Sequence, residues 1–116
     1  MKDQFVKMFI FGLISIQILI KILKKIIRQK RPIQKEHTDF GMPSTRAGLV
    51  FFIASYILLS ISSLSFETKI LIIAFAFCSS LMKVILKVHT IFQITVGGII
   101  GVILGYVFYN IALMQI

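Results

Sequence analysis

Cysteine, histidine and acidic residues are scarce in this chain. Its 116 residues include one cysteine, two histidines and four acidic side chains. The lone Cys78 excludes an internal disulfide and leaves the redox compartment undefined. Two histidines without a carboxylate cluster do not provide the ligands of a metal site. We therefore expect neither a metal nor another cofactor.

The chain also has too few polar residues to cover a soluble globule, because 58% of its residues are hydrophobic and its mean hydropathy is +0.97. A helix needs about twenty apolar residues to cross a bilayer core of about 30 Å. Such windows occur at residues 5–23, 47–66, 70–88 and 91–114. The sequence predicts an all-α, multi-pass integral membrane protein, a single domain of about four transmembrane helices over residues 1–116.

The first apolar window is interrupted by Lys7, Gln17 and Lys21. Lysines near helix ends can raise their ammonium groups to the lipid headgroups, so these interruptions are compatible with a span. Lys24 and Lys25 follow the window directly, and no small-residue cleavage site does. We therefore expect a membrane helix here and not a cleaved signal peptide.

Positive charge, in contrast, is plentiful and unevenly placed. The net charge is +9, and many of the cations lie in or beside the connection at 24–46: Lys24, Lys25, Arg28, Lys30, Arg31, Lys35 and Arg46. Such a patch ordinarily fixes membrane topology and attracts anionic headgroups. It is short, lacks interleaved aromatics and lies against the bilayer, so we expect no nucleic-acid partner.

The alternation of spans places this basic connection relative to the rest of the chain. We expect tight turns at Glu67 to Lys69 and near His89 and Thr90. The basic connection and the His89 turn then share one membrane face, while both termini and Glu67 lie at the other. Cations and a histidine that are distant in sequence would converge there to form an anion site.

Three short motifs follow one another in this part of the chain. K-x6-R-P runs from Lys24 to Arg31 and Pro32, G-M-P-S-T-R occupies 41–46, and K-x5-H-x3-Q runs from Lys83 through His89 to Gln93. In order and spacing they resemble the signature of the type 2 phosphatidic acid phosphatase superfamily, which includes lipid phosphate and isoprenoid diphosphate phosphatases.

The resemblance implies an enzyme that removes phosphate from a phosphorylated lipid through a phosphohistidine intermediate. It implies that His89 is the nucleophile and that Gln93 orients its ring. The phosphoryl oxygens would be bound by Lys24, Arg31, Ser44, Thr45 and Lys83. Cancelling charge on those oxygens is the main chemical requirement of phosphoryl transfer.

The chain departs from the family pattern at three positions. Arg46 stands where a general-acid histidine is expected, and a guanidinium does not release its proton. Gln93 replaces an aspartate, so it can accept a hydrogen bond but cannot stabilise an imidazolium by charge. Lys83 replaces an arginine and loses the bidentate fork. Loss of the acid alone costs about 10² to 10⁴ in rate.

Several alternatives stay open at this point. A diphosphate needs less protonation of its leaving group, whose charge Arg46 could stabilise, or His37 could supply the proton. The chain could instead be an inactive pseudophosphatase that binds phosphorylated lipids or a membrane partner. It could also be a small structural or pore-forming protein whose cations only fix topology, with His89 merely holding a helix start.

The last span carries Gly97, Gly101 and Gly105 on one face, which predicts close helix packing. Members of the resembled family usually have six spans and this chain resembles the last four, so we expect a homo-oligomer or a partner membrane subunit. Its basic residues predict a cytosolic site, whereas the resemblance implies a lumenal or exterior one. The richness in Ile, Lys and Phe favours an AT-rich genome, of a bacterium or a large DNA virus.

Overall fold

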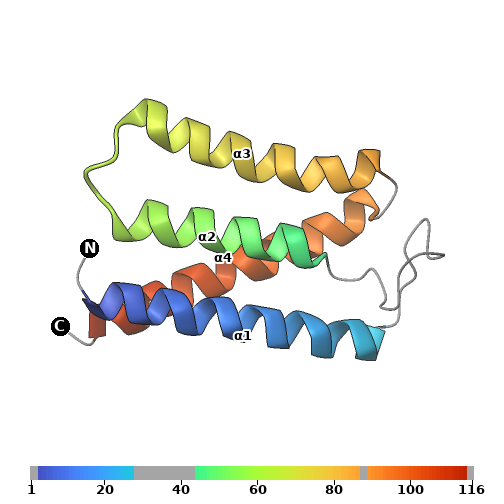
Figure 1. Cartoon of the computed structure of the whole chain (residues 1–116), viewed down its shortest axis with the longest axis horizontal. Helices are drawn as coiled ribbons and strands as arrows, with labels where there is room; N and C mark the ends of the chain where they lie inside the picture. The colour runs from blue at the N-terminus through green and yellow to red at the C-terminus, as the bar shows by residue number, and fades with distance from the viewer. Residues whose placement is uncertain (1–2, 28–43, 87–88, 115–116) are drawn as a thin grey trace.

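The computed structural model describes residues 3–27, 44–86 and 89–114, and these form four helices and no strand (Figure 1). The helices are α1 (Asp3–Ile27), α2 (Thr45–Ser60), α3 (Phe66–Ile85) and α4 (Ile91–Met114). The predicted all-α class is therefore confirmed. Within the described residues, α1, α3 and α4 are long and apolar enough to cross a membrane.

Helix α2 is shorter than the apolar window that predicted it. Its 16 residues rise about 1.5 Å each, or about 24 Å in total, against a bilayer core of about 30 Å. The helix ends at Ser60, and the Ser65 hydroxyl caps α3 by accepting a hydrogen bond from the Thr68 backbone N–H at 3.2 Å. The turn expected at Glu67 to Lys69 thus lies earlier, at 61–65, and Glu67 belongs to the first turn of α3.

Successive helices run in opposite directions, so their ends alternate between two poles of the molecule. The end of α1, the start of α2 and the α3–α4 turn lie at one pole, while the α2–α3 turn and both ends of the chain lie at the other (Figure 1). This alternation agrees with the expectation that the two ends of the basic connection and the His89 turn share one face.

Helices α2 and α4 form the closest helix pair, and glycines permit this approach. A Cβ added at Gly101 would lie 2.4 Å from the Gly48 carbonyl oxygen, and one at Gly105 would lie 2.0 Å from Ser55 Oγ. At Gly97 the nearest atom would be the Ser44 carbonyl oxygen, at 2.5 Å. The predicted glycine face of α4 is thus confirmed, and it packs against the backbone of α2.

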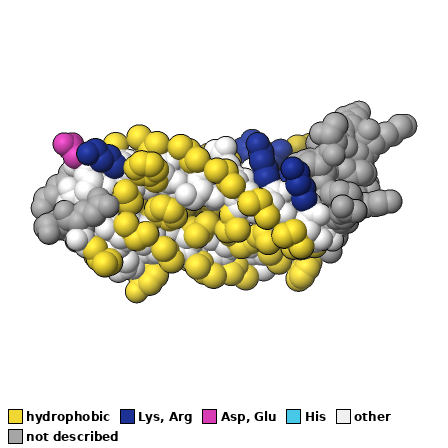
Figure 2. Space-filling view, turned by 90° about the horizontal axis from the view of Figure 1, so that it is seen from below, with side chains coloured by type: hydrophobic (Ala, Val, Ile, Leu, Met, Phe, Trp, Pro, Cys, Tyr) yellow, Lys and Arg dark blue, Asp and Glu magenta, His cyan; other side chains and the backbone are white. Residues whose placement is uncertain are grey.

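The interior is small and the outer surface is largely apolar, as in a protein surrounded by lipid. Ile16, Ile20, Phe52 and Tyr56 form the centre of the core, and Tyr56 donates a hydrogen bond to the Phe5 carbonyl. The face drawn in Figure 2 carries apolar side chains along its middle and charged ones toward its two ends. Exposed apolar residues on α1 include Val6, Ile10, Ile14, Ile18, Ile22 and Ile26.

Candidate active site at the basic pole

His89 and Gln93 are buried together at the start of α4. His89 is 3% exposed and Gln93 is fully buried, and Gln93 Oε1 lies 3.3 Å from His89 Nδ1. The same Oε1 accepts the Thr90 backbone N–H at 3.0 Å, while the Gln93 backbone N–H donates to Thr90 Oγ1 at 3.1 Å. This reciprocal pair is a capping box that begins α4 at Ile91.

The capping box also fixes how the imidazole is protonated. A backbone N–H only donates, so the Gln93 atom that it meets must be the carbonyl oxygen and not the amide nitrogen. That oxygen in turn requires a donor at His89 Nδ1. In a neutral ring this contact favours the tautomer with its hydrogen on Nδ1, in which Nε2 is the unprotonated nitrogen and the one that could act as a nucleophile.

Ser44 joins the second motif to the third. It is fully buried, and its backbone N–H donates to the Gln93 carbonyl at 3.2 Å. Gly97 allows this contact, because a side chain there would strike the Ser44 backbone. Ser44 Oγ caps α2 by accepting the Ala47 backbone N–H at 3.3 Å, which leaves the hydroxyl hydrogen able to donate to a ligand.

Lys24 is the buried cation of the site, with only 4% of its surface exposed. Ile20 packs on Gly48, since a Cβ at Gly48 would lie 2.4 Å from Ile20 Cδ1. Because α1 and α2 are antiparallel, one further turn along α1 reaches Lys24 at the level of Ser44, one turn before Gly48 (Figure 1). A buried ammonium at the end of a membrane helix is a candidate anion-binding group.

Two further cations named by the motifs, Lys83 of α3 and Arg46 of α2, have contacts with α3 or the turn after it. The His89 backbone N–H donates to the Lys83 carbonyl at 3.1 Å, and the Lys83 side chain is half-buried. Arg46 is exposed, and its Nη1 donates to Ser79 Oγ on α3 at 3.4 Å. Thr45, the first residue of α2, is half-buried. Arg46 thus connects two helices at the same pole.

Arg31, Pro32 and His37 lie outside the described residues. Within those residues, no group of histidine, cysteine and acidic side chains could hold a metal ion. Two contacts of these site residues were not predicted from the sequence: that of Thr90 with Gln93 and that of Ser79 with Arg46. The T-x-x-Q spacing of Thr90 and Gln93 is a capping-box signature that could have revealed the first. Nothing in the sequence indicates the second, Ser79.

The arrangement provides what a phosphoryl group needs. Helices α2 and α4 both begin at this pole, and helix N-termini carry partial positive charge and N–H donors. Lys24 and Lys83 lie in the last turns of α1 and α3 and would contribute cationic side chains there, and His89 would contribute an imidazole before the start of α4. Together these groups can hold an anion beside a nucleophile.

Comparisons with known proteins agree with this chemistry. The model of the PAP2 superfamily matches residues 5–116. This chain belongs to the PAP2 superfamily. The resemblance seen in the three motifs is thereby confirmed, and the membership supports a membrane phosphatase type of function.

Two similar PAP2 proteins come from Arabidopsis thaliana. Lipid phosphate phosphatase epsilon 1, chloroplastic, is 33% identical over 115 residues, which cover 91% of this chain and 41% of that protein. Lipid phosphate phosphatase epsilon 2, chloroplastic, is 30% identical over 115 residues, which cover 91% of this chain and 40% of that protein. The chain thus spans about two fifths of the length of these relatives. No solved structure matches it.

Proposed function

We propose that this PAP2 protein is a multi-pass membrane phosphatase that hydrolyses phosphorylated lipids through a phosphohistidine at His89. One observation carries the proposal: Gln93 Oε1 lies 3.3 Å from Nδ1 of a buried His89, a contact that favours the tautomer in which Nε2 carries no hydrogen. Membership of the PAP2 superfamily and two relatives with lipid phosphate phosphatase in their names support it.

The reaction proceeds in two steps. The Nε2 lone pair of His89 forms a bond to phosphorus, and the bond from phosphorus to the leaving oxygen breaks with its electrons on that oxygen. Lys24, Lys83 and the Ser44 hydroxyl stabilise the charge on the other phosphoryl oxygens, with Arg31 as a further cation. Water then attacks phosphorus, releases phosphate and restores the free imidazole.

The leaving group decides which substrates react well. Arg46 occupies the position of the family's general acid, and its guanidinium can stabilise charge but cannot supply a proton. The phosphate-type leaving group of a diphosphate needs less protonation than the alkoxide of a monoester. We therefore propose that isoprenoid diphosphates react faster than phosphatidate, by up to the factor of about 10² to 10⁴ that acid catalysis usually contributes.

The test measures phosphate release by the purified protein in lipid nanodiscs from both substrate classes. Rapid quenching with labelled substrate should trap an acid-labile phosphoryl adduct on His89, and His89→Ala should lose both adduct and turnover. His37→Ala, which changes the other histidine, should still form the adduct. Equal phosphate release by His89→Ala and the unmodified chain would disprove the proposal.

The same geometry supports a second candidate, an inactive protein that binds phosphorylated lipid. It is favoured by the side chain of Arg46, which donates to Ser79 on α3 while standing in the place of the catalytic acid. An inactive protein would bind vesicles containing phosphatidate in a manner sensitive to Lys24→Met and Arg31→Ala. It would form no adduct on His89 under conditions that saturate binding.

A further inference from the structure

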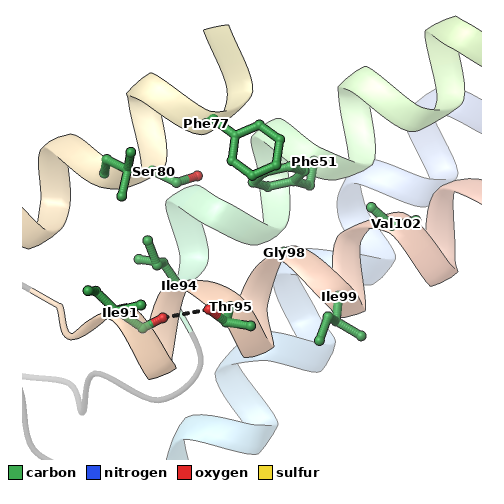
Figure 3. Close-up of a pocket in the computed structure, with 10 residues that line it drawn as sticks. Phe51, Phe77, Ser80, Ile91, Ile94, Thr95, Gly98, Ile99 and Val102 are labelled. Atoms are coloured by element: carbon green, nitrogen blue, oxygen red, sulfur yellow. Dashed lines mark hydrogen bonds between the residues drawn. The ribbon is translucent and has the colours of Figure 1, made fainter. Parts of the chain in front are cut away.

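An apolar cleft of about 470 Å³ opens beside the active site, between α3 and α4 (Figure 3). Phe51 of α2 forms its floor, and Phe77 and Leu81 of α3 form one wall. The wall from α4 includes Ile91, Ile99 and Val102. Phe51 and Phe77 meet edge to face with their ring centres 5.1 Å apart.

The cleft suits hydrocarbon because its few polar groups already have partners. Its hydroxyls belong to Ser80 and Thr95. Ser80 Oγ donates to the Ala76 carbonyl at 2.9 Å, and Thr95 Oγ1 donates to the Ile91 carbonyl at 2.8 Å (Figure 3). A polar ligand would find few groups with which to replace its hydrogen bonds to water, and burying it here would be costly.

The cleft starts at the end of α4 that follows His89 and extends along α4 toward the opposite pole. It begins at Ile91, two residues after His89, and reaches Val102 along α4, about 16 Å at 1.5 Å per residue. This is roughly half of a bilayer core. Lys83, two residues beyond Leu81, places positive charge at the same end as His89. An anionic head and an apolar tail would each meet a complementary surface.

We propose that this cleft binds one hydrocarbon chain of the lipid whose phosphate lies at His89. The inference rests on the proposed function and adds how the enzyme recognises the rest of its substrate. The hydrocarbon chain of the lipid enters sideways from the bilayer, because Ile91, Ile99 and Val102 along the cleft are 64%, 55% and 45% exposed.

Gly98 determines how far the hydrocarbon chain of the lipid can extend along the cleft. A Cβ added there would lie 3.1 Å from the Phe51 ring, so a larger side chain would extend into the cleft over its aromatic floor. Gly98 is more than two turns of α4 from His89. A leucine at this position would shorten the cleft and leave the reacting groups in place.

The kinetic test compares a long-chain alkyl diphosphate with a four-carbon one in nanodiscs. Gly98→Leu should lower kcat/KM for the long-chain diphosphate by about tenfold or more. Each methylene group that loses its contact with a pocket lowers kcat/KM by about tenfold or more. Turnover of the short chain should stay unchanged. Val107→Leu enlarges an exposed residue of α4 outside the cleft and should change neither. An equal loss for both chain lengths, or no loss, would overturn the proposal.

A second readout does not depend on turnover. A long-chain alkyl phosphate with a diazirine at its tail end should crosslink to the peptide that contains Ile99 and Val102, in His89→Ala as in the unmodified chain. Excess unlabelled alkyl phosphate should prevent the crosslink, whereas the corresponding alcohol should not. If turnover is absent and this labelling persists, the proposed function fails and the cleft assignment stands. Absence of this labelling, or labelling that the alcohol prevents as well as the alkyl phosphate does, would overturn the proposal.

Discussion

The side-chain oxygen of Gln93 makes two contacts, one with the backbone of Thr90 and one with the ring of His89. This atom, Oε1, accepts the Thr90 backbone N–H at the start of α4, and it lies 3.3 Å from His89 Nδ1. Either a carboxylate or an amide can accept these two hydrogen bonds. The amide therefore provides both acceptor contacts, but it lacks the negative charge with which a carboxylate would stabilise an imidazolium.

Replacing Gln93 with glutamate should restore that charge and raise turnover. Glutamate is also favoured at this position of a capping box, so α4 should begin as before. Orienting carboxylates are worth up to about 10⁴ in a catalytic triad, and we expect a gain of about tenfold or more in the adduct-forming rate. The measurement is single-turnover formation of the phosphohistidine by rapid quench.

Two variants separate orientation of His89 from stability of α4. Gln93→Leu removes the acceptor and should slow adduct formation. Thr90→Val removes only the hydroxyl that accepts the Gln93 N–H, and it should cost about 1 kcal/mol of stability with a smaller effect on rate. If Gln93→Glu folds normally and forms the adduct no faster than the unmodified chain, the charge of this side chain does not limit the reaction.

The sequence could place some site residues but not others. The resemblance to the family motif predicted that Gln93 orients His89, and the two side chains are in contact, with Gln93 Oε1 3.3 Å from His89 Nδ1. Ser44 and Lys24 could be placed at the same pole from the alternation of spans. The bond from Arg46 to Ser79 could not be predicted, since it joins residues 33 positions apart and depends on how α2 and α3 lean together.

At the level of elements, the glycines of α4 bring the parts of the candidate site on α2 and α4 close together. They allow α4 to approach α2 closely enough for the Ser44 N–H to reach the Gln93 carbonyl. The sequence predicted this face from its four-residue spacing. It did not predict where α2 ends, because the serines after Ser60 interrupt the helix and cap the next one while the hydropathy stays high.

Gly101→Ala should destabilise the helix pair. Its Cβ would lie 2.4 Å from the Gly48 oxygen and 2.9 Å from the Phe52 nitrogen, both backbone atoms that cannot rotate away. Overpacking of this kind costs about 1 to 3 kcal/mol, more than the roughly 0.5 to 1 kcal/mol that alanine gains over glycine in a helix. The thermal midpoint in detergent should fall.

Gly98→Ala is the matched control for Gly101→Ala. The nearest atoms to its Cβ belong to the Phe51 side chain, at 3.1 Å, and that ring borders the open cleft and can shift. Its thermal midpoint should stay near that of the unmodified chain or rise. A Gly101→Ala protein as stable as Gly98→Ala would mean that α2 and α4 do not pack backbone to backbone.

For the whole molecule, the distribution of charge and apolar surface defines how it would sit in a bilayer. Apolar side chains cover the middle of the face in Figure 2, and charged ones lie toward its ends. The end of α1, the start of α2 and the α3–α4 turn meet at one pole, the basic pole, and these segments contain Lys24, Ser44 and His89. Both ends of the chain lie at the opposite pole (Figure 1). If the bundle spans the bilayer as one unit, the active site opens at one membrane surface only.

This geometry predicts opposite sidedness for the two turns of the bundle. In a Cys78→Ser background, Ser62→Cys lies in the exposed α2–α3 turn and Thr90→Cys lies in the exposed α3–α4 turn. A membrane-impermeant maleimide added to sealed, oriented vesicles should label one of them, and the other should react only after permeabilisation. Tags at both termini should behave as Ser62→Cys does, because they share its pole. Labelling of both cysteines from the same side would show that α3 does not cross the membrane, and the active site would then need a different arrangement in the bilayer.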